Sequence, residues 1–195
     1  MKARSLLPLL AVMFLFFLKS VYATSDEAEK HLKMAVNEVI VIANHSSDRK
    51  ALAESVKPTL QNILSFETMT RRAVGPGWRQ FTQDQQKEAI ALFTTLIIRT
   101  YSAKFTPGEL AAISFKTATS PAPGRMEVPS TIVYKGSRYE VVYRLDEADG
   151  WKIADVVIEG VSMIANYRSQ FDAEFKQGGA DAIIKALKRS LNSPQ

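Results

Sequence analysis

The sequence WKIADVVIEGVSMIANYRSQF, residues 151–171, decides the fold because it predicts a strand that turns directly into a helix. Its first part is rich in β-branched and apolar residues, including Ile153 and Val156, which favour a strand. Gly160 interrupts that run, and apolar residues then recur at helical spacing as far as Phe171. A strand that leads straight into an amphipathic helix forms a corner of a packed core. We therefore expect the rest of the chain to supply more sheet and another layer of helices.

Ser162 lies at the predicted start of this helix, where its hydroxyl can accept a hydrogen bond from a free backbone N–H group. The sequence from Gly160 to Ile164 begins like the nucleophile elbow of hydrolases but lacks the second glycine. No histidine follows Ser162, although those hydrolases place one after the serine. We therefore interpret Ser162 as a helix cap. Asp155 and Glu159 could share one strand face as an acid–base pair, but we prefer a local hydrogen bond or ion pair for Asp155.

The start of the chain predicts a secretory signal peptide at residues 1–23. A basic beginning precedes an apolar run at residues 6–18, and small residues end at Ala23. The apolar run is shorter than the roughly 20 residues that a membrane-spanning helix needs. The chain has no cysteine, which excludes disulfides and a lipid-modified cysteine. We expect an exported, soluble protein with a single domain at residues 24–195.

The formal net charge of +5 includes the basic residues of the expected signal peptide, which contains no acidic residue. Basic and acidic side chains nearly balance in the rest of the chain, so we predict no nucleic-acid partner. The two histidines, His31 and His45, lack the close spacing of metal ligands. The sequence therefore predicts no metal, no cofactor and no catalytic residue, and we do not expect an enzyme.

Helical patterns come first in the chain. Apolar residues at helical spacing predict a helix over residues 25–45 and a second one from Asp48, with Pro58 opening a new turn. The sequence Gly-Pro-Gly at residues 75–77 ends any helix there. The clearest helix is predicted over residues 82–104, because its Thr-x-x-Gln start matches a capping box.

Alternating apolar residues then predict four strands, near residues 113–115, 126–132, 139–145 and 151–158. Pro129 interrupts the second strand, which suggests an edge or a bulge. Short turns join the strands, as in an antiparallel meander. The sequence thus predicts an α+β domain whose helices pack on one face of a curved, mainly antiparallel four-stranded sheet.

Several segments resemble the MlaC family of periplasmic phospholipid carriers, also called toluene-tolerance proteins. Within residues 151–171 the resemblance lies in Trp-Lys-Ile-x-Asp-Val, Gly-Val-Ser-Met and Asn-Tyr-Arg-Ser-Gln-Phe. It continues over residues 66–79, with Phe, Met-Thr-Arg, Gly and Trp-Arg, and along the helix at residues 85–101. An aspartate usually precedes that phenylalanine in the family, whereas this chain has Ser65.

The predicted order of helices and strands resembles an NTF2-like arrangement, and the resemblance to the family implies that the apolar pocket between sheet and helices holds lipid tails. A diacyl phospholipid carries on the order of thirty methylenes, and exposing each one to water costs about 0.8 kcal/mol. A carrier must therefore sheathe the tails, while the head group can stay in solvent. The side chains that we expect to line the pocket are Phe66, Met69, Phe93, Leu96, Ile97, Tyr101, Phe115, Val128, Ile132, Val141, Tyr143, Ile164, Tyr167 and Phe171.

The resemblance also implies a cellular role and partners. The protein would be a periplasmic monomer that carries phospholipid, its expected ligand, between an outer-membrane lipoprotein complex and an inner-membrane ABC transporter complex. This traffic would maintain the lipid asymmetry of the outer membrane. Arg71, Arg72 and Arg79 lie near the Gly-Pro-Gly break, and we expect them to contact a partner protein or lipid head groups. The alternative is that these arginines are ordinary charged side chains in contact with solvent.

The sequence is also compatible with two other functions. One is an enzyme with an NTF2-like pocket, such as an isomerase or a dehydratase. It would need acid–base groups in the pocket, and Tyr143 with Asp155 is the pair to inspect. The other is a periplasmic interaction module with a solid core and no ligand.

Overall fold

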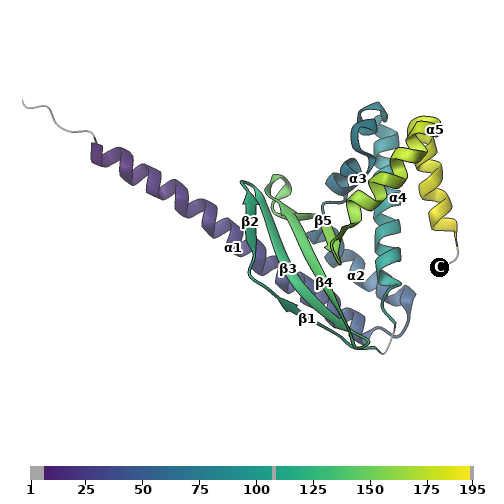
Figure 1. The fold of residues 1–195 in the computed structure, drawn as a ribbon, viewed down its shortest axis with the longest axis horizontal. Helices are drawn as coiled ribbons and strands as arrows, with labels where there is room; N and C mark the ends of the chain where they lie inside the picture. The colour runs from purple at the N-terminus through teal and green to yellow at the C-terminus, as the bar shows by residue number, and fades with distance from the viewer. Residues whose placement is uncertain (1–6, 107–108, 194–195) are drawn as a thin grey trace, which may run out of the picture.

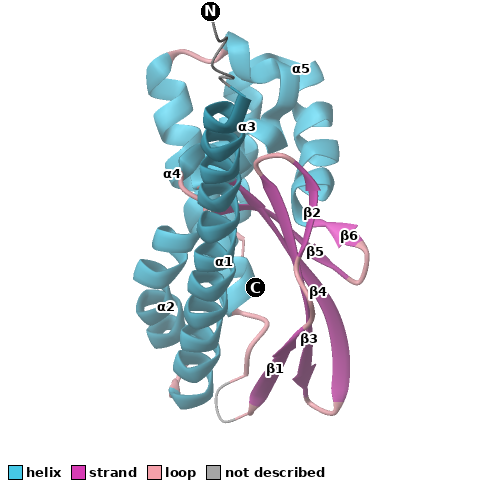
Figure 2. Ribbon diagram, turned by 90° about the vertical axis from the view of Figure 1, so that its left-hand side faces the viewer, coloured by secondary structure: helices cyan, strands magenta, loops and turns pink. Residues whose placement is uncertain are grey.

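The structure is a computed structural model that describes residues 7–106 and 109–193. Figure 2 shows α1 and α2 beside the long strands of the sheet, and Figure 1 shows α3 and α5 together at one end of the molecule. The helices are α1 (Leu7–His45), α2 (Arg49–Ile63), α3 (Phe66–Val74), the 3₁₀ helix η1 (Gly75–Gln80), α4 (Gln83–Ser102), the 3₁₀ helix η2 (Glu147–Asp149) and α5 (Met163–Asn192). The strands are β1 (Ala111–Phe115), β2 (Thr119–Ala122), β3 (Arg125–Tyr134), β4 (Ser137–Asp146), β5 (Lys152–Ile158) and β6 (Val161–Ser162).

The sheet has six strands, all paired antiparallel, in the order β1-β3-β4-β5-β6, with β2 also pairing with β3. The α+β class with an antiparallel sheet is confirmed, but the prediction of four strands is wrong. The additional strands β2 and β6 are short, and β2 is exposed along its whole length. Neither one alternates between apolar and polar residues, so the sequence pattern could not indicate them. The NTF2-like assignment stays a prediction.

Pro129 lies inside β3, which is a central strand and not an edge. On one side of β3, β2 pairs with residues 125–127 and β1 with residues 130–134. The carbonyl of Pro129 accepts a hydrogen bond from the backbone N–H of Lys116 on that same side, at 2.8 Å. In an antiparallel strand the N–H and C=O of one residue point the same way. The missing N–H of Pro129 therefore falls between β1 and β2, where it removes no bond of the ladder.

Two helices differ from the prediction. α1 begins at Leu7 and not at residue 25, because the leucine, alanine and methionine residues of the expected signal peptide also have good helix propensity. α2 continues through Pro58 as one helix. Its buried residues, Leu52, Val56 and Ile63, lie on both sides of the proline, so packing of one face holds the helix together. In the described part of the chain, we find no helix long and apolar enough to cross a membrane.

Other predicted helix ends are confirmed. The side chain of Asp48 accepts a hydrogen bond from the backbone N–H of Ala51 at 2.8 Å and caps α2. Thr82 and Gln85 form the predicted capping box of α4, with reciprocal hydrogen bonds of 2.9 and 3.2 Å. α3 ends directly before Gly75, whose φ of 70° lies in the left-handed region that glycine tolerates.

One apolar cluster joins the helices to the sheet. It includes Leu32 of α1, Met69 of α3, Phe93 of α4, Val128 of β3 and Ile183 of α5, each at most 2% exposed. Burial of such side chains stabilises the fold by about 1.5–3 kcal/mol each relative to exposure. The main core therefore lies where the helical layer meets the sheet.

Candidate functional site

All of the side chains predicted to line a lipid pocket belong to this main apolar cluster. They come from α3, α4 and α5 on the helical side and from β1, β3 and β4 in the sheet. Most are buried, while Tyr101, Phe115, Ile132 and Tyr167 are partly buried and pack against the others. The structure thus brings together residues that are far apart in the chain. Their role in lining a pocket stays a prediction.

Aromatic rings hold this interior together. The ring of Phe93 meets the ring of Tyr167 edge to face, with centroids 4.9 Å apart, and that of Phe171 at 5.7 Å. These contacts join α4 to α5. On the sheet, the rings of Phe115 and Tyr143 lie 6.5 Å apart. Such pairs add to the stability gained from burial alone.

The tyrosine hydroxyls of the interior are held in the neutral form. Burial raises the pKa of Tyr143 to about 12. Burial is also the largest cause that raises the pKa of Tyr101 to about 12, with smaller contributions from Tyr167 and Asp155. The pKa of Tyr167 is raised by burial as well. At neutral pH these side chains therefore add no charge to the apolar interior.

Tyr143 and Asp155, the pair considered for an enzyme, do not face one another. In the register of β4 and β5, Tyr143 is opposite Val156, whereas Arg144 is opposite Asp155. Because successive residues of a strand point to opposite faces, the side chains of Tyr143 and Asp155 project from different faces of the sheet. The two side chains therefore cannot act together on one substrate.

The carboxylate of Asp155 instead fixes the corner between β5 and α5. It accepts hydrogen bonds from the Ser162 hydroxyl at 2.7 Å, from the Ile164 backbone N–H at 3.1 Å and from Arg144 at 3.3 Å. The Ser162 hydroxyl in turn accepts from the backbone N–H of Ala165 at 3.0 Å, so its predicted role as the cap of α5 is confirmed. The predicted local bonding of Asp155 is confirmed too.

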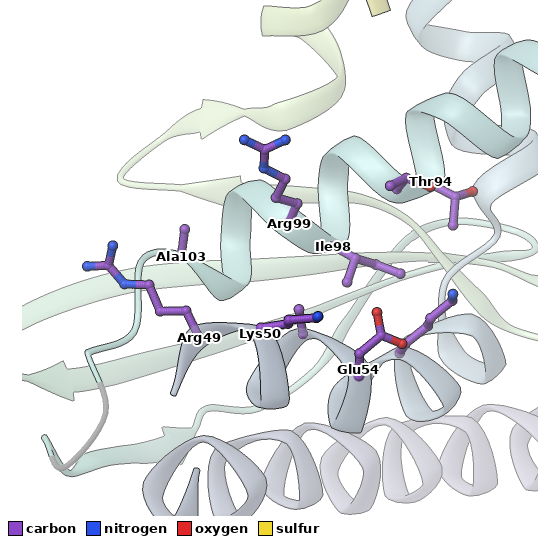
Figure 3. Close-up of a pocket in the computed structure, with 10 residues that line it drawn as sticks. Arg49, Lys50, Glu54, Thr94, Ile98, Arg99 and Ala103 are labelled. Carbon is purple, nitrogen blue, oxygen red and sulfur yellow. The ribbon is translucent and has the colours of Figure 1, made fainter. Parts of the chain in front are cut away.

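A surface pocket of about 430 Å³ lies between α2 and α4 (Figure 3). Most of the residues that line it are charged or polar, including Arg49, Lys50, Glu54 and Lys57. Arg99, which also lines it, donates a hydrogen bond to the carbonyl of Ser193 at 2.7 Å and so ties down the end of α5. This pocket contains none of the side chains predicted to contact lipid tails.

A second surface pocket gathers arginines at the junction of α3, η1 and α5. The prediction grouped Arg72 with Arg71 and Arg79, but the structure separates it. Arg72 forms an ion pair with Asp146 at the end of β4, which draws its side chain away. Arg168 of α5 takes its place, and sequence reasoning missed it because α3 and α5 are far apart in the chain. The pocket has a volume of about 390 Å³ and is lined by Arg71, Gly75, Pro76, Trp78, Arg79 and Arg168.

Metal ligands do not gather in the described part of the structure. Among those residues, we find no group of three or more histidine, cysteine, aspartate or glutamate side chains that could hold a metal ion. The arrangement offers an apolar interior and a basic surface pocket.

The chain belongs to the MlaC family: the family's model, described as MlaC protein, matches residues 33–189. The matched residues run from within α1 to within α5 and include every strand. A search of the curated proteins found no match.

Among solved structures, the chain is similar to a phospholipid-binding protein from Ralstonia solanacearum, solved in complex with a phospholipid. The TM-score is 0.76 and the sequence identity is 24%, and the likeness covers 84% of this chain and 96% of that chain. At this identity the likeness shows a shared fold.

Proposed function

We propose that the protein is a soluble periplasmic phospholipid carrier that sheathes acyl chains in the interior between its sheet and its helices. The carried lipid would move between an inner-membrane ABC transporter complex and an outer-membrane lipoprotein complex, in support of the lipid asymmetry of the outer membrane. The signal peptide at residues 1–23 would direct export and be removed, and residues 24–195 would work as a monomer.

The observation that carries the proposal is the composition of the interior. Apolar side chains from α3, α4 and α5 meet those of β1, β3 and β4, and the tyrosines among them stay neutral. Membership of the MlaC family and the shared fold with a phospholipid-binding protein support the same function. The polar groups of the corner, Asp155 and Ser162, are engaged in structural hydrogen bonds.

The physical demand on such a carrier is large. Unassisted passage of a diacyl lipid through water meets a barrier on the order of 20 kcal/mol from exposed methylenes alone. An apolar chamber without ionised groups removes most of that barrier and places few constraints on the head group. We therefore expect a carrier with weak head-group selectivity.

Native mass spectrometry of the protein purified from a bacterial periplasm tests this proposal, with organic extraction to identify the bound molecule. Ile132 and Val133 of β3 offer a matched pair of positions. Ile132 packs against the main cluster, whereas its neighbour Val133 is 39% exposed, and the two side chains point to opposite faces. Ile132→Trp places a large ring in the proposed chamber, and Val133→Trp places the same ring outside it.

We expect a mass excess that extracts as phospholipid in the wild-type protein and in Val133→Trp, and a several-fold lower lipid content in Ile132→Trp. Circular dichroism would show whether both variants are folded. A wild-type protein that carries no lipid and takes none up from anionic vesicles would contradict the carrier function and favour the interaction module with a solid core. Equal lipid content in both variants would place the lipid elsewhere on the protein.

A further inference from the structure

The arginine pocket, formed by Arg71, Arg79 and Arg168 around Gly75, is a site that the proposed chamber does not use. Arg71 lies in the last turn of α3, Arg79 in η1 and Arg168 in α5. A Cβ atom at Gly75 would stand 3.1 Å from the guanidinium of Arg168. The glycine therefore lets the guanidinium lie against the backbone between α3 and η1, and the φ of +70° suits no other residue well.

The arginines of the arginine pocket are unpaired within the described structure. Arg71, Arg79 and Arg168 are exposed, and none of them forms an ion pair with another described residue. Glu67 and Asp172 lie one helical turn from Arg71 and Arg168 and still make no such pair. The three positive charges repel one another within this small pocket. A bound anion would relieve that repulsion, because all three guanidinium groups attract it.

One wall of the arginine pocket is apolar. Trp78 lines the pocket, is partly buried and packs against the main cluster. Its ring also lies 5.3 Å from the ring of Phe81, which is buried. Pro76 lines the pocket as well. The pocket therefore joins guanidinium donors to an apolar surface that continues into the core, which differs from a scatter of solvated charges.

We propose that the arginine pocket binds a phosphate oxyanion. Guanidinium groups present planar pairs of N–H donors that match the oxygens of phosphate, and arginine is favoured over lysine for such recognition. The charged oxygens of inorganic phosphate, and the two non-bridging oxygens of a phosphodiester, can each accept hydrogen bonds from more than one guanidinium group. The phosphodiester of a phospholipid head group and free inorganic phosphate share this chemistry. The inference rests on the pocket and stands independently of the proposed carrier function.

Phosphate binding can be measured by NMR from the arginine side-chain Nε–Hε signals of the protein purified from the periplasm. Titration with inorganic phosphate should shift the signals of Arg71, Arg79 and Arg168 to saturation, while sodium chloride at equal ionic strength should not. Arg168→Gln should weaken phosphate binding at least tenfold. Arg138→Gln, at an exposed arginine of β4, should leave it unchanged. If Arg168→Gln fails to fold, Arg79→Gln serves the same test.

Shifts that do not saturate, or that chloride reproduces, would overturn the proposal, as would equal weakening by Arg138→Gln. Uptake of lipid from phosphatidylglycerol vesicles then separates the two sources of phosphate. A variant that loses both phosphate binding and lipid uptake supports the head group as the source, and one that loses only phosphate binding supports free phosphate. A wild-type protein that binds phosphate but takes up no lipid supports the arginine pocket while contradicting the carrier function.

Discussion

The apolar interior and the arginine pocket are neighbours that are built in opposite ways. Tyr167 and Arg168 are adjacent in α5, yet Tyr167 packs on Phe93 inside the core and Arg168 lies in the exposed pocket. The interior is buried and neutral, so its side chains stabilise the fold. The arginine pocket is exposed and charged, so its side chains contribute little to stability. The difference shows that one helix carries a side chain packed in the core beside an exposed, charged one.

Phe93→Ala should cause the largest loss and so gives the strongest test of the interior. Phe93 is fully buried and contacts the rings of Tyr167 and Phe171. We expect the free energy of unfolding in urea to fall by about 3–5 kcal/mol, because the substitution leaves a cavity between α4 and α5. Phe93→Leu should lower the free energy of unfolding by clearly less. A loss for Phe93→Ala as small as that of Arg168→Gln, which we expect within about 0.5 kcal/mol, would remove the contrast between the two regions.

Alkaline pH should weaken the interior through Tyr143. Its pKa is raised from 10.0 to about 12 in the folded state, so the unfolded chain releases the proton first. The stabilising contribution is complete below the unfolded pKa and is lost as pH rises through the folded value. The loss approaches about 3 kcal/mol over that window, because each unit of pKa shift corresponds to about 1.4 kcal/mol.

Chemical denaturation at a series of pH values, compared between wild type and Tyr143→Phe, checks this expectation. The variant should lose less stability between about pH 10 and 12. Tyr139→Phe, at a more exposed tyrosine of the same strand, should follow the wild-type curve. Identical curves for all three proteins would show that Tyr143 ionises as easily in the folded state as in the unfolded chain.

Gly77→Ala should disturb both regions, because Gly77 of η1 packs directly against α5. A Cβ atom there would come within 2.8 Å of the ring of Phe175. We expect a loss of about 1–3 kcal/mol from overpacking, together with weaker phosphate binding as Trp78 is displaced. In a Phe175→Ala background, Gly77→Ala should cost less stability. A double-mutant cycle measures this coupling between the two positions. Full additivity of the two substitutions would contradict the steric explanation.

Arg72 and Arg71 should give the smallest effects and the finest comparison. Arg72 of α3 forms its ion pair with Asp146 of β4, whereas Arg71 lies in the arginine pocket. Arg72→Gln should lower stability by up to about 1 kcal/mol and leave phosphate binding intact, since the pair is partly exposed. Arg71→Gln should weaken phosphate binding and leave stability unchanged. Unfolding in urea measures the effect on stability, and the phosphate titration measures the effect on binding. Weaker phosphate binding in Arg72→Gln, with intact binding in Arg71→Gln, would contradict the placement of Arg71 in the phosphate site.

Local signals explain the features that could be predicted. Thr82 and Ser162 were identified as caps, and Asp48 as the start of a helix, from their own side chains and the few residues that follow. The apolar alternation around Val128 and Tyr143 marked strands whose inward side chains are buried. These features depend on neighbours within a turn or a strand, so the sequence carries them directly.

Tertiary contacts decided the rest. Pro129 fits a central strand only because β1 and β2 leave a gap beside it, and the bonding of β6 requires β5 as a partner. Arg72 lies outside the arginine pocket because it pairs with Asp146, and Arg168, for which the sequence predicted no role, lies in the pocket because it reaches the α3–η1 junction. The sequence by itself determined the class of fold and which apolar side chains face the interior, since their periodicity is a local property of residue order, and the resemblance of its motifs indicated the family. Which charges meet, and where they remain unpaired, depends on distances between segments remote in the chain, and folding alone sets those distances.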